Sequence, residues 1–314
     1  MNTLKIIFAG TEYFSAAYLN VLITSSYKIV AVLTQPDRPS GRGQKIHFSP
    51  VKILSLHHKI PIYQPINLND VLFQNRILNL NADIMIVVSY GKIIPKKILN
   101  MFSKGCINVH PSLLPKWRGS TPIQSSILYG DKKTGISIIQ MNDKIDSGEI
   151  IYSTECNISS KDTTKSLSLK LIKIGTRGLL ETLKNIILNK IIKIKQNENY
   201  MTLSKKIYKI DALLNWNLHA QQLERRIRAF NPWPICHFTF KNVNIKVWEA
   251  TIIPIAEKKF SIGEIVCANQ YGIQINTAYQ ILNLEKIQLP GKKIMDIKNI
   301  IISKKNFFKI GAII

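Results

Sequence analysis

A short segment near residue 108 joins an amide and an imidazole at the end of an apolar run. Asn108 and His110 lie in the segment that begins at Cys106 and is stopped by Pro111. Because successive side chains of a strand point to opposite faces, Asn108 and His110 would share one face. An amide can stabilise an oxyanion, and an imidazole can handle protons. Alone, however, Asn-x-His is a weak signal, because a histidine at a strand end is more often a hydrogen-bonded structural residue.

A carboxylate further along the chain can add a third group to Asn108 and His110. Asp146 follows a strand pattern and stands before Ser147-Gly148, which predicts a turn. An Asp in that position commonly only bonds its own turn, but a loop there can also reach the same sheet edge. An Asn, His and Asp set without a Ser or Cys nucleophile fits direct transfer, in which the acceptor itself attacks and the protein supplies donors and a proton acceptor.

The elements that must position these residues follow an alternating strand and helix pattern, which is typical of a parallel sheet covered on both faces. Strands are predicted at 5–9, 28–33, 84–88, 106–109, 136–141 and 150–155. Helices are predicted at 14–23, 51–58, 71–80 and 163–189, the second with Ser49 as N-cap and Pro50 as its first residue. Open sheets of this kind bind ligands at the carboxyl ends of their strands, which is where His110 would lie.

The rest of the chain has a different texture. A polar, lysine-rich stretch at 190–209 predicts a linker, followed by a helix at 220–229. Short strands are predicted at 235–240, 245–250, 264–267, 272–276 and 279–284. The fold class predicted is therefore α/β: a Rossmann-like catalytic domain at 1–189, the linker, and a small β-barrel of the oligonucleotide-binding type at 210–314.

Several other kinds of site are disfavoured. The turn after the first strand has only Gly10, whereas a dinucleotide fingerprint needs three glycines, and the spacing from Gly41 to Lys45 does not fit a phosphate-binding P-loop. The four cysteines form no C-x-x-C pair and the histidines show no metal spacing, so neither a metal nor a disulfide framework is expected. The long loop at 35–50 is either a solvated surface loop or a phosphate-contacting one.

The net charge of +24 favours nucleic acid or another polyanion as a partner. Abundant Lys, Ile and Asn leave open that part of this charge reflects a genome rich in A and T. The stretch from Lys190 onward is the more densely basic part. No apolar run is long enough to span a membrane, and the N-terminus does not resemble a secretory signal, so a cytoplasmic protein is expected.

Motifs along essentially the whole chain resemble those of the methionyl-tRNA formyltransferases. They are Phe8-Ala9-Gly10-Thr11, Thr34-Gln35-Pro36-Asp37-Arg38-Pro39, Gly41-Arg42-Gly43, Asn108-Val109-His110, Ser112-Leu113-Leu114-Pro115, Trp117-Arg118-Gly119, Asp146-Ser147-Gly148 and Arg228-Ala229-Phe230-Asn231-Pro232-Trp233-Pro234. The sequence departs from the pattern at Glu12 and Tyr13, where Pro and Asp are expected, and at Asn142, where Asp is expected.

The resemblance implies transfer of the formyl group of 10-formyltetrahydrofolate to the α-amino group of methionyl initiator tRNA, without a metal. A monomer is expected. It makes Asn108, His110 and Asp146 catalytic. It also implies that folate binds against Ser112, Leu113, Leu114 and Pro115, and that the 35–50 loop meets the tRNA acceptor end through Arg42. The charges expected to contact tRNA phosphates are Lys205, Lys206 and Lys209.

Two alternatives stay open at this point. A folate-dependent formyltransferase acting on a small nucleotide-linked amine would explain the three catalytic candidates equally well, but it would not need a basic C-terminal domain. A non-catalytic RNA-binding protein would explain the charge, but it would not need Asn108, His110 and Asp146 together.

Overall fold

The structure is a computed structural model that describes residues 3–40, 43, 45–254, 260–303 and 307–314. The chain forms two compact units, each built from several segments. Unit 1 comprises Met1–Pro122, Lys133–Asn157 and Ser168–Lys205, and unit 2 comprises Ile123–Lys132, Ile158–Leu167 and Lys206–Ile314. Arg42 lies outside the described residues.

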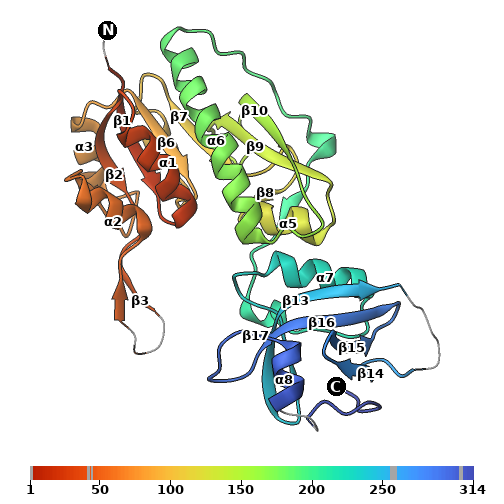
Figure 1. The fold of residues 1–314 in the computed structure, drawn as a ribbon. Helices are drawn as coiled ribbons and strands as arrows, with labels where there is room; N and C mark the ends of the chain where they lie inside the picture. Colours follow the sequence, from red (N-terminus) through yellow and green to blue (C-terminus); the bar gives the residue numbers. More distant parts are fainter. Residues whose placement is uncertain (1–2, 41–42, 44, 255–259, 304–306) are drawn as a thin grey trace. The chain divides into compact units, whose positions relative to one another are not determined.

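Unit 1 is built on a seven-stranded sheet of order β10-β9-β7-β6-β1-β2-β5 (Figure 1). The strands are β1 (Lys5–Gly10), β2 (Lys28–Leu33), β5 (Ile62–Tyr63), β6 (Ile84–Val88), β7 (Cys106–His110), β9 (Lys133–Gln140) and β10 (Ile150–Asn157). The five strands from β5 to β7 are parallel, while β9 and β10 add an antiparallel edge. All five residues of β6 are buried, as expected for a strand covered on both faces.

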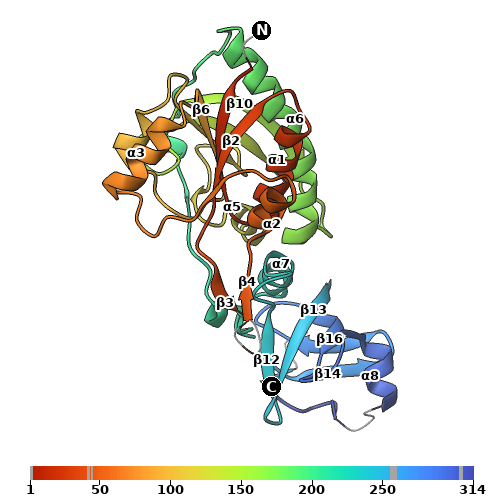
Figure 2. The same ribbon diagram turned by 90° about the vertical axis from the view of Figure 1, so that its left-hand side faces the viewer.

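Helices cover both faces of this sheet (Figure 2). On one side lie α1 (Tyr13–Ile23), α2 (Pro50–His57) and α6 (Thr164–Ile187), and on the other α3 (Val71–Asn79) and the short α4 (Lys96–Leu99). The predicted N-cap of α2 is confirmed, because the Ser49 hydroxyl accepts the Lys52 N–H at 3.0 Å and Pro50 opens the helix. Parallel strands alternating with helices on both faces confirm the predicted Rossmann-like domain.

Unit 2 contains an antiparallel sheet of order β12-β13-β16-β15-β14, with β17 paired to β16, curled into a half-barrel. Its elements are α7 (Ala220–Ala229), β12 (His237–Phe240), β13 (Val243–Ile253), β14 (Ile265–Asn269), β15 (Gly272–Asn276), β16 (Ile281–Gln288), β17 (Met295–Asp296) and α8 (Ile297–Ser303). Helix α7 packs against β13 and β16. Register shifts between β13 and β16 near Glu249 let the long strands bend. The antiparallel, strand-rich C-terminal part predicted from the sequence is confirmed.

Short elements that the sequence patterns did not predict add to unit 1. A hairpin forms from β3 (Arg38–Ser40) and β4 (Lys45–His47) within the loop at 35–50. A second pair joins β8 (Arg118–Gly119) to β11 (Leu203–Ser204) in parallel. This pairing brings the stretch before β11, including the one-turn helix η1 (Glu198–Tyr200), alongside the loop that follows β7. Across the described part of the chain, no helix combines the length and apolarity needed to cross a bilayer.

Candidate active site

Asn108 and His110 lie at the carboxyl end of β7, the parallel strand next to the antiparallel strands β9 and β10. Strand β7 pairs with β6 on one side and with β9 on the other, so the backbone that carries both side chains is held on either side. The intervening Val109 is 1% exposed in the core, whereas Asn108 is half-buried and His110 is 4% exposed. The alternation predicted from the sequence therefore places the amide and the imidazole together.

Asp146 meets both of these side chains from the loop between β9 and β10. Its Oδ1 accepts the Asn108 amide N–H at 3.1 Å, and its Oδ2 accepts the backbone N–H of Gly119 at 2.8 Å. The Nδ1 atom of His110 lies 3.5 Å from the same Oδ2. The structure thus brings Asn108, His110 and Asp146 into one cluster, with the Asp146 side chain 14% exposed.

The His110 ring has an oxygen atom opposite each nitrogen. Nε2 lies 3.0 Å from the carbonyl oxygen of Trp117, and a carbonyl only accepts, so Nε2 carries a hydrogen. Nδ1 faces the Asp146 carboxylate, which also accepts when ionised. The 3.5 Å separation between Nδ1 and the Asp146 carboxylate is long for a charge-assisted bond, so a substrate oxygen can approach Nδ1.

The backbone at Asp146 adopts an uncommon conformation. Its φ is +49°, in the left-handed region that non-glycine residues seldom occupy but Asp tolerates better than most. The Gln196 amide donates to the Asp146 and Gly148 carbonyls, both at 2.8 Å. A Cβ at Gly148 would come within 1.8 Å of the Gln140 carbonyl oxygen, so the loop packs closely against the end of β9. The position of the carboxylate therefore depends on this local packing.

The segment from Ser112 to Pro115 forms a fixed turn directly after β7. The buried Ser112 hydroxyl donates to the Lys116 carbonyl, closing the turn. Ser137 on β9 accepts the Leu114 N–H at 3.0 Å and donates to the Ser112 carbonyl at 2.8 Å. The Ser112 side chain is thus engaged within its own loop, and what the turn presents outward is peptide groups and apolar side chains.

The cysteine nearest this cluster has the properties of a core residue. Cys106 begins β7, is 1% exposed, and its thiol contacts the Leu99 carbonyl. Burial raises the pKa of Cys106 to about 12, so the thiol is protonated at neutral pH and unsuited to act as a nucleophile. Among the described residues, no group of three or more His, Cys, Asp or Glu side chains is placed to hold a metal ion.

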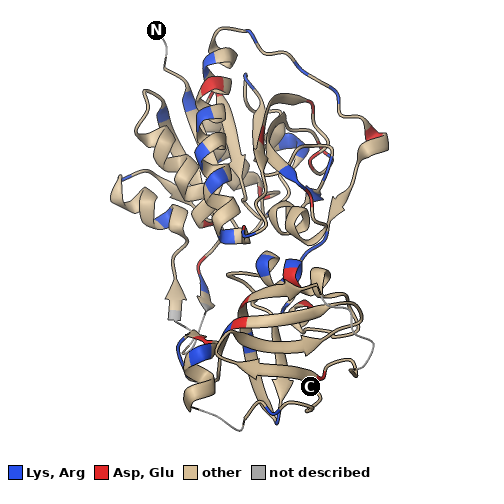
Figure 3. Ribbon diagram, turned by 45° about the vertical axis from the view of Figure 1, so that its right-hand side comes forward, with Lys and Arg blue, Asp and Glu red and all other residues tan. Residues whose placement is uncertain are grey.

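The predicted tRNA-contacting lysines are exposed. Lys205 ends unit 1, whereas Lys206 and Lys209 belong to unit 2, and each side chain is open to solvent. The Lys206 ammonium lies 5.6 Å from the centroid of the Tyr208 ring, which is itself exposed. Lys and Arg residues also recur along the long helix α6 and on α7 (Figure 3). These lysines are not part of the Asp146 cluster.

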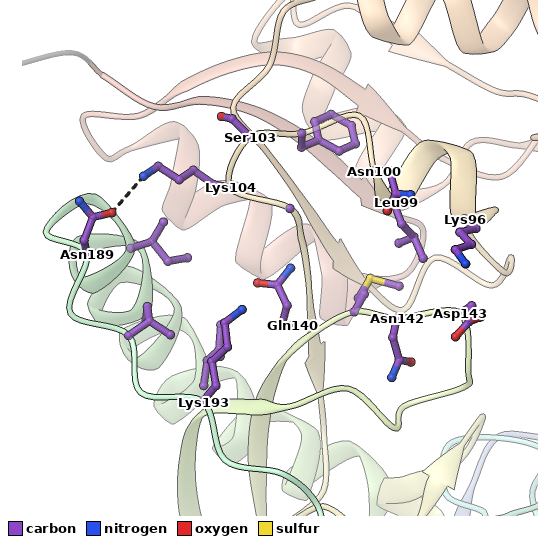
Figure 4. Close-up of a pocket in the computed structure, with 16 residues that line it drawn as sticks. Lys96, Leu99, Asn100, Ser103, Lys104, Gln140, Asn142, Asp143, Asn189 and Lys193 are labelled. Carbon is purple, nitrogen blue, oxygen red and sulfur yellow. Dashed lines mark hydrogen bonds between the residues drawn. The ribbon is translucent and has the colours of Figure 1, made fainter.

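A separate cavity of about 870 Å³ opens elsewhere in unit 1 (Figure 4). Its charged lining includes Lys96, Lys104, Lys193 and Asp143, and Lys104 donates to the Asn189 side chain at 3.1 Å. Asn108, His110 and Asp146 are not among the residues that line it. The cavity offers cations and amides but not the imidazole and paired carboxylate found at the end of β7, so the chemistry is assigned to the latter.

Two side chains that support the site, Gln196 and Arg118, were not predicted from the sequence. Gln196 lies in the stretch predicted to be a linker, yet its amide bonds the Asp146 loop 50 residues away. Arg118 stood within a recognised motif without a predicted role, and its guanidinium holds Gln196. The motif around Trp117-Arg118-Gly119 was a signal that the region mattered, but no sequence feature indicated its partner.

Comparisons with known proteins agree with one another. A family model described as formyl transferase matches residues 1–183, and one described as formyl transferase, C-terminal domain, matches residues 206–305. Methionyl-tRNA formyltransferase of Buchnera aphidicola subsp. Acyrthosiphon pisum (strain Tuc7) is 71% identical over 314 residues, covering 100% of both chains. That of Buchnera aphidicola subsp. Schizaphis graminum (strain Sg) is 62% identical with the same coverage.

A solved structure shares the fold at much lower identity. It is an N-formyltransferase from Helicobacter canadensis in complex with folinic acid and dTDP-3-aminofucose, with a TM-score of 0.68 and 18% identity. The likeness covers 90% of the chain and 99% of that structure. At this identity the match shows the fold alone.

Proposed function

The chain belongs to the methionyl-tRNA formyltransferase family, and we propose that Asn108, His110 and Asp146 carry out its reaction. The protein transfers a formyl group from a folate-derived donor to the amino group of methionine on initiator tRNA. We propose 10-formyltetrahydrofolate as that donor. Its formyl group sits on an anilinic nitrogen, whose lone pair is delocalised into the ring and which therefore leaves more readily than an alkyl amine.

The proposed reaction is a direct transfer through a tetrahedral intermediate. The neutral amine of the methionyl group attacks the formyl carbon, and the carbonyl oxygen gains negative charge as the C–N bond forms. Asn108 and His110 stabilise this oxyanion by donating hydrogen bonds. Asp146 accepts the proton that the attacking amine loses. His110 gives a proton to the folate nitrogen as the bond between this nitrogen and the formyl carbon breaks, and transfer of the proton from Asp146 to His110 restores both groups.

The observation that carries this proposal is the hydrogen bonding of the Asp146 carboxylate. Asn108 gives one of its two amide hydrogens to Oδ1, so its second hydrogen can be directed at a formyl oxygen. Gly119 and His110 approach Oδ2, which holds the carboxylate in one orientation beside the imidazole. A proton acceptor and two oxyanion donors thus lie within contact of one another before any substrate arrives.

The donor is proposed to lie against Ser112 to Pro115. This turn directly follows His110, and two bonds to Ser137 hold its backbone in place at the edge of the catalytic cluster. The Ser112 hydroxyl is already engaged by the Lys116 carbonyl. Contacts to folate would therefore come from backbone atoms and from the Leu113 side chain.

The division of labour along the chain is also proposed. Residues 1–189 form the catalytic domain, 190–209 a basic linker, and 210–314 the tRNA-binding domain. Lys205, Lys206 and Lys209 are proposed to contact phosphates, supported by their exposure and by the overall charge of +24. Arg42 is proposed to contact the acceptor end of the tRNA. We propose that the protein acts as a monomer in the cytoplasm.

The decisive experiment is formylation by the purified protein with 10-formyltetrahydrofolate and methionylated initiator tRNA, beside an uncharged-tRNA control. Asn108→Ala, His110→Ala and Asp146→Ala are expected to lower kcat sharply while leaving tRNA binding intact. Asn75→Ala, which removes an exposed amide from α3, is the matched control and should change nothing. Retention of full kcat by all three site variants would contradict the proposal, as would formylation of uncharged tRNA.

A further inference from the structure

The Gln196 side chain bonds the backbone of the Asp146 loop from a distant part of unit 1. Its amide nitrogen donates to the Asp146 and Gly148 carbonyls at 2.8 Å each, bridging both sides of Ser147. We infer that Gln196, fixed by Arg118, is a positioning residue that sets the place of the Asp146 carboxylate. The inference rests on the proposed function, because it assumes that Asp146 takes part in the reaction.

The orientation of the Gln196 amide is dictated by its neighbours. The Nε and Nη2 atoms of Arg118 both donate to Oε1 of Gln196, at 3.0 and 2.7 Å. A guanidinium has only hydrogens to offer, so the amide oxygen must face Arg118. The amide nitrogen is thereby turned toward the two carbonyls, which only accept. A flipped amide would put donors against donors and oxygen against oxygen.

The charge of Arg118 is balanced away from the catalytic carboxylate. Arg118 is 5% exposed, and its Nη1 and Nη2 atoms form a two-point pair with Glu198 at 3.0 and 2.8 Å. This pairing holds the pKa of the Glu198 carboxyl below its usual range. Arg118 therefore acts on Asp146 through the neutral Gln196 amide and not through an ion pair, which would weaken Asp146 as a proton acceptor.

The Asp146 loop adopts a backbone conformation that needs support from its surroundings. Asp146 has a φ of +49°, and the preceding Ile145 side chain is 59% exposed. Left-handed backbone at a non-glycine residue persists only where the surroundings enforce it. The two bonds from Gln196 satisfy carbonyls on either side of the turn and so oppose its relaxation.

The residue that follows Arg118 contacts the Asp146 carboxylate directly. The N–H of Gly119 donates to Asp146 Oδ2, and β8 pairs Gly119 with Ser204 of β11. A Cβ at Gly119 would lie 2.7 Å from the Ser204 carbonyl oxygen. The stretch from Gln196 to Ser204 therefore supports Asp146 at both its backbone and its carboxylate.

Gln196→Glu separates positioning from folding. One carboxylate oxygen can still pair with Arg118, and more strongly than the amide does, so the fold should be retained. The other oxygen would face two carbonyls and repel them. We expect kcat to fall about 10- to 100-fold, since displacements near 1 Å at a reacting group have effects of that size. The KM values for tRNA and folate should stay within about twofold, because Gln196 acts on catalysis and not on binding.

Controls address charge and folding. Asn75→Asp makes the same amide-to-carboxylate change on exposed α3 and should leave kcat unaltered. Gln196→Met keeps the length of the side chain, adds no charge and removes both donors, and its kcat should also fall. Melting temperatures of all three variants, measured with the intact protein, show whether any loss of activity reflects unfolding.

A double-mutant cycle with Asp146→Asn decides whether Gln196 works through Asp146. In the Asp146→Asn background, added Gln196→Glu should change single-turnover rates by less than about twofold, because coupled positions are not additive. Folded Gln196→Glu protein with unaltered kcat would overturn the inference. An equal loss in both backgrounds would overturn it as well. Undiminished activity of Asp146→Asn itself would instead remove the proposed catalytic role of Asp146, so the two failures are distinguishable.

Discussion

The Asp146 loop and the basic stretch from Lys205 to Lys209 represent opposite ways of placing charged groups. The Asp146 carboxylate accepts hydrogen bonds from Asn108 and Gly119, and the Asp146 backbone carbonyl accepts one from Gln196. The three lysines of the basic stretch extend into solvent. We propose that the first region acts through a fixed geometry, and the second through the summed charge of several exposed side chains.

This difference fits the role that we propose for each region. A formyl transfer requires a proton acceptor and oxyanion donors at defined positions, and errors of about 1 Å at such positions reduce rates strongly. A tRNA backbone repeats its charge, so several cations can contribute without precise placement. Substitutions in the loop should therefore change kcat, and substitutions in the basic stretch should change the KM for tRNA and its salt dependence.

The largest effect is expected from Asp146→Asn. The substitution keeps the shape of the side chain but removes its negative charge, and its amide can no longer accept from both Asn108 and Gly119. Loss of a general base typically costs about 10² to 10⁴ in rate, so kcat should fall within that range. Single-turnover formylation with saturating donor and tRNA measures this loss.

The same preparation provides a control for binding. Asp146 is not one of the exposed lysines proposed to contact tRNA. The affinity of Asp146→Asn for initiator tRNA should therefore match that of the wild type. Ser147→Ala, which loses only hydrogen bonds to Asn142 and Lys144 in the adjacent turn, should retain most activity. If kcat of Asp146→Asn stayed within a fewfold of the wild-type value, the Asp146 carboxylate would not take part in the reaction.

The second-largest effect should come from Gly148→Ala. A Cβ there would lie 1.8 Å from the Gln140 carbonyl oxygen, and because the obstacle is backbone, the loop itself must move. We expect kcat to fall at least about tenfold, as displaced catalytic groups do, with a small drop in melting temperature. Gly291→Asn is the control: its φ is +71°, which Asn tolerates, and the added Cβ would meet open space. Gly148→Ala with normal kcat would show that the loop adapts without consequence.

Sequence patterns predicted the regular elements well, because their signals are local. The run 84–88 is buried throughout and is a strand as predicted, and the helix at 220–229 matches α7. Asn108 and His110 were expected to share a face because strand periodicity requires it. Asp146 was expected to come close to them, and in the structure the loop between β9 and β10 places it there.

The features that sequence could not predict depend on contacts between distant segments. The β8 and β11 pair spans only two residues on each side, too short for any periodic signal. Gln196 bonds Arg118 across 78 residues, and a polar, lysine-rich stretch gives no indication that one amide within it is engaged. Tertiary contacts alone decide such positions.

The smallest effect is expected from the basic stretch. Combined Lys205→Ala, Lys206→Ala and Lys209→Ala should raise the KM for tRNA several-fold without altering kcat, because exposed charges contribute independently. If all three contact phosphates, the slope of log affinity against log salt should become shallower by about 2 to 3. Formylation rates measured across tRNA and salt concentrations report both quantities.

A triple control distinguishes contact with tRNA from a general loss of charge. Lys5, Lys28 and Lys97 are also exposed, and Lys5 and Lys28 begin β1 and β2, at the end of the parallel strands opposite the catalytic cluster. Removing them lowers the net charge equally, so long-range attraction falls by a similar amount in both variants. An equal change of KM and salt slope in both triple variants would mean that the positive charge attracts tRNA only diffusely. A change confined to Lys205, Lys206 and Lys209 would make that stretch a contact surface, and an altered kcat there would erase the contrast with the Asp146 loop.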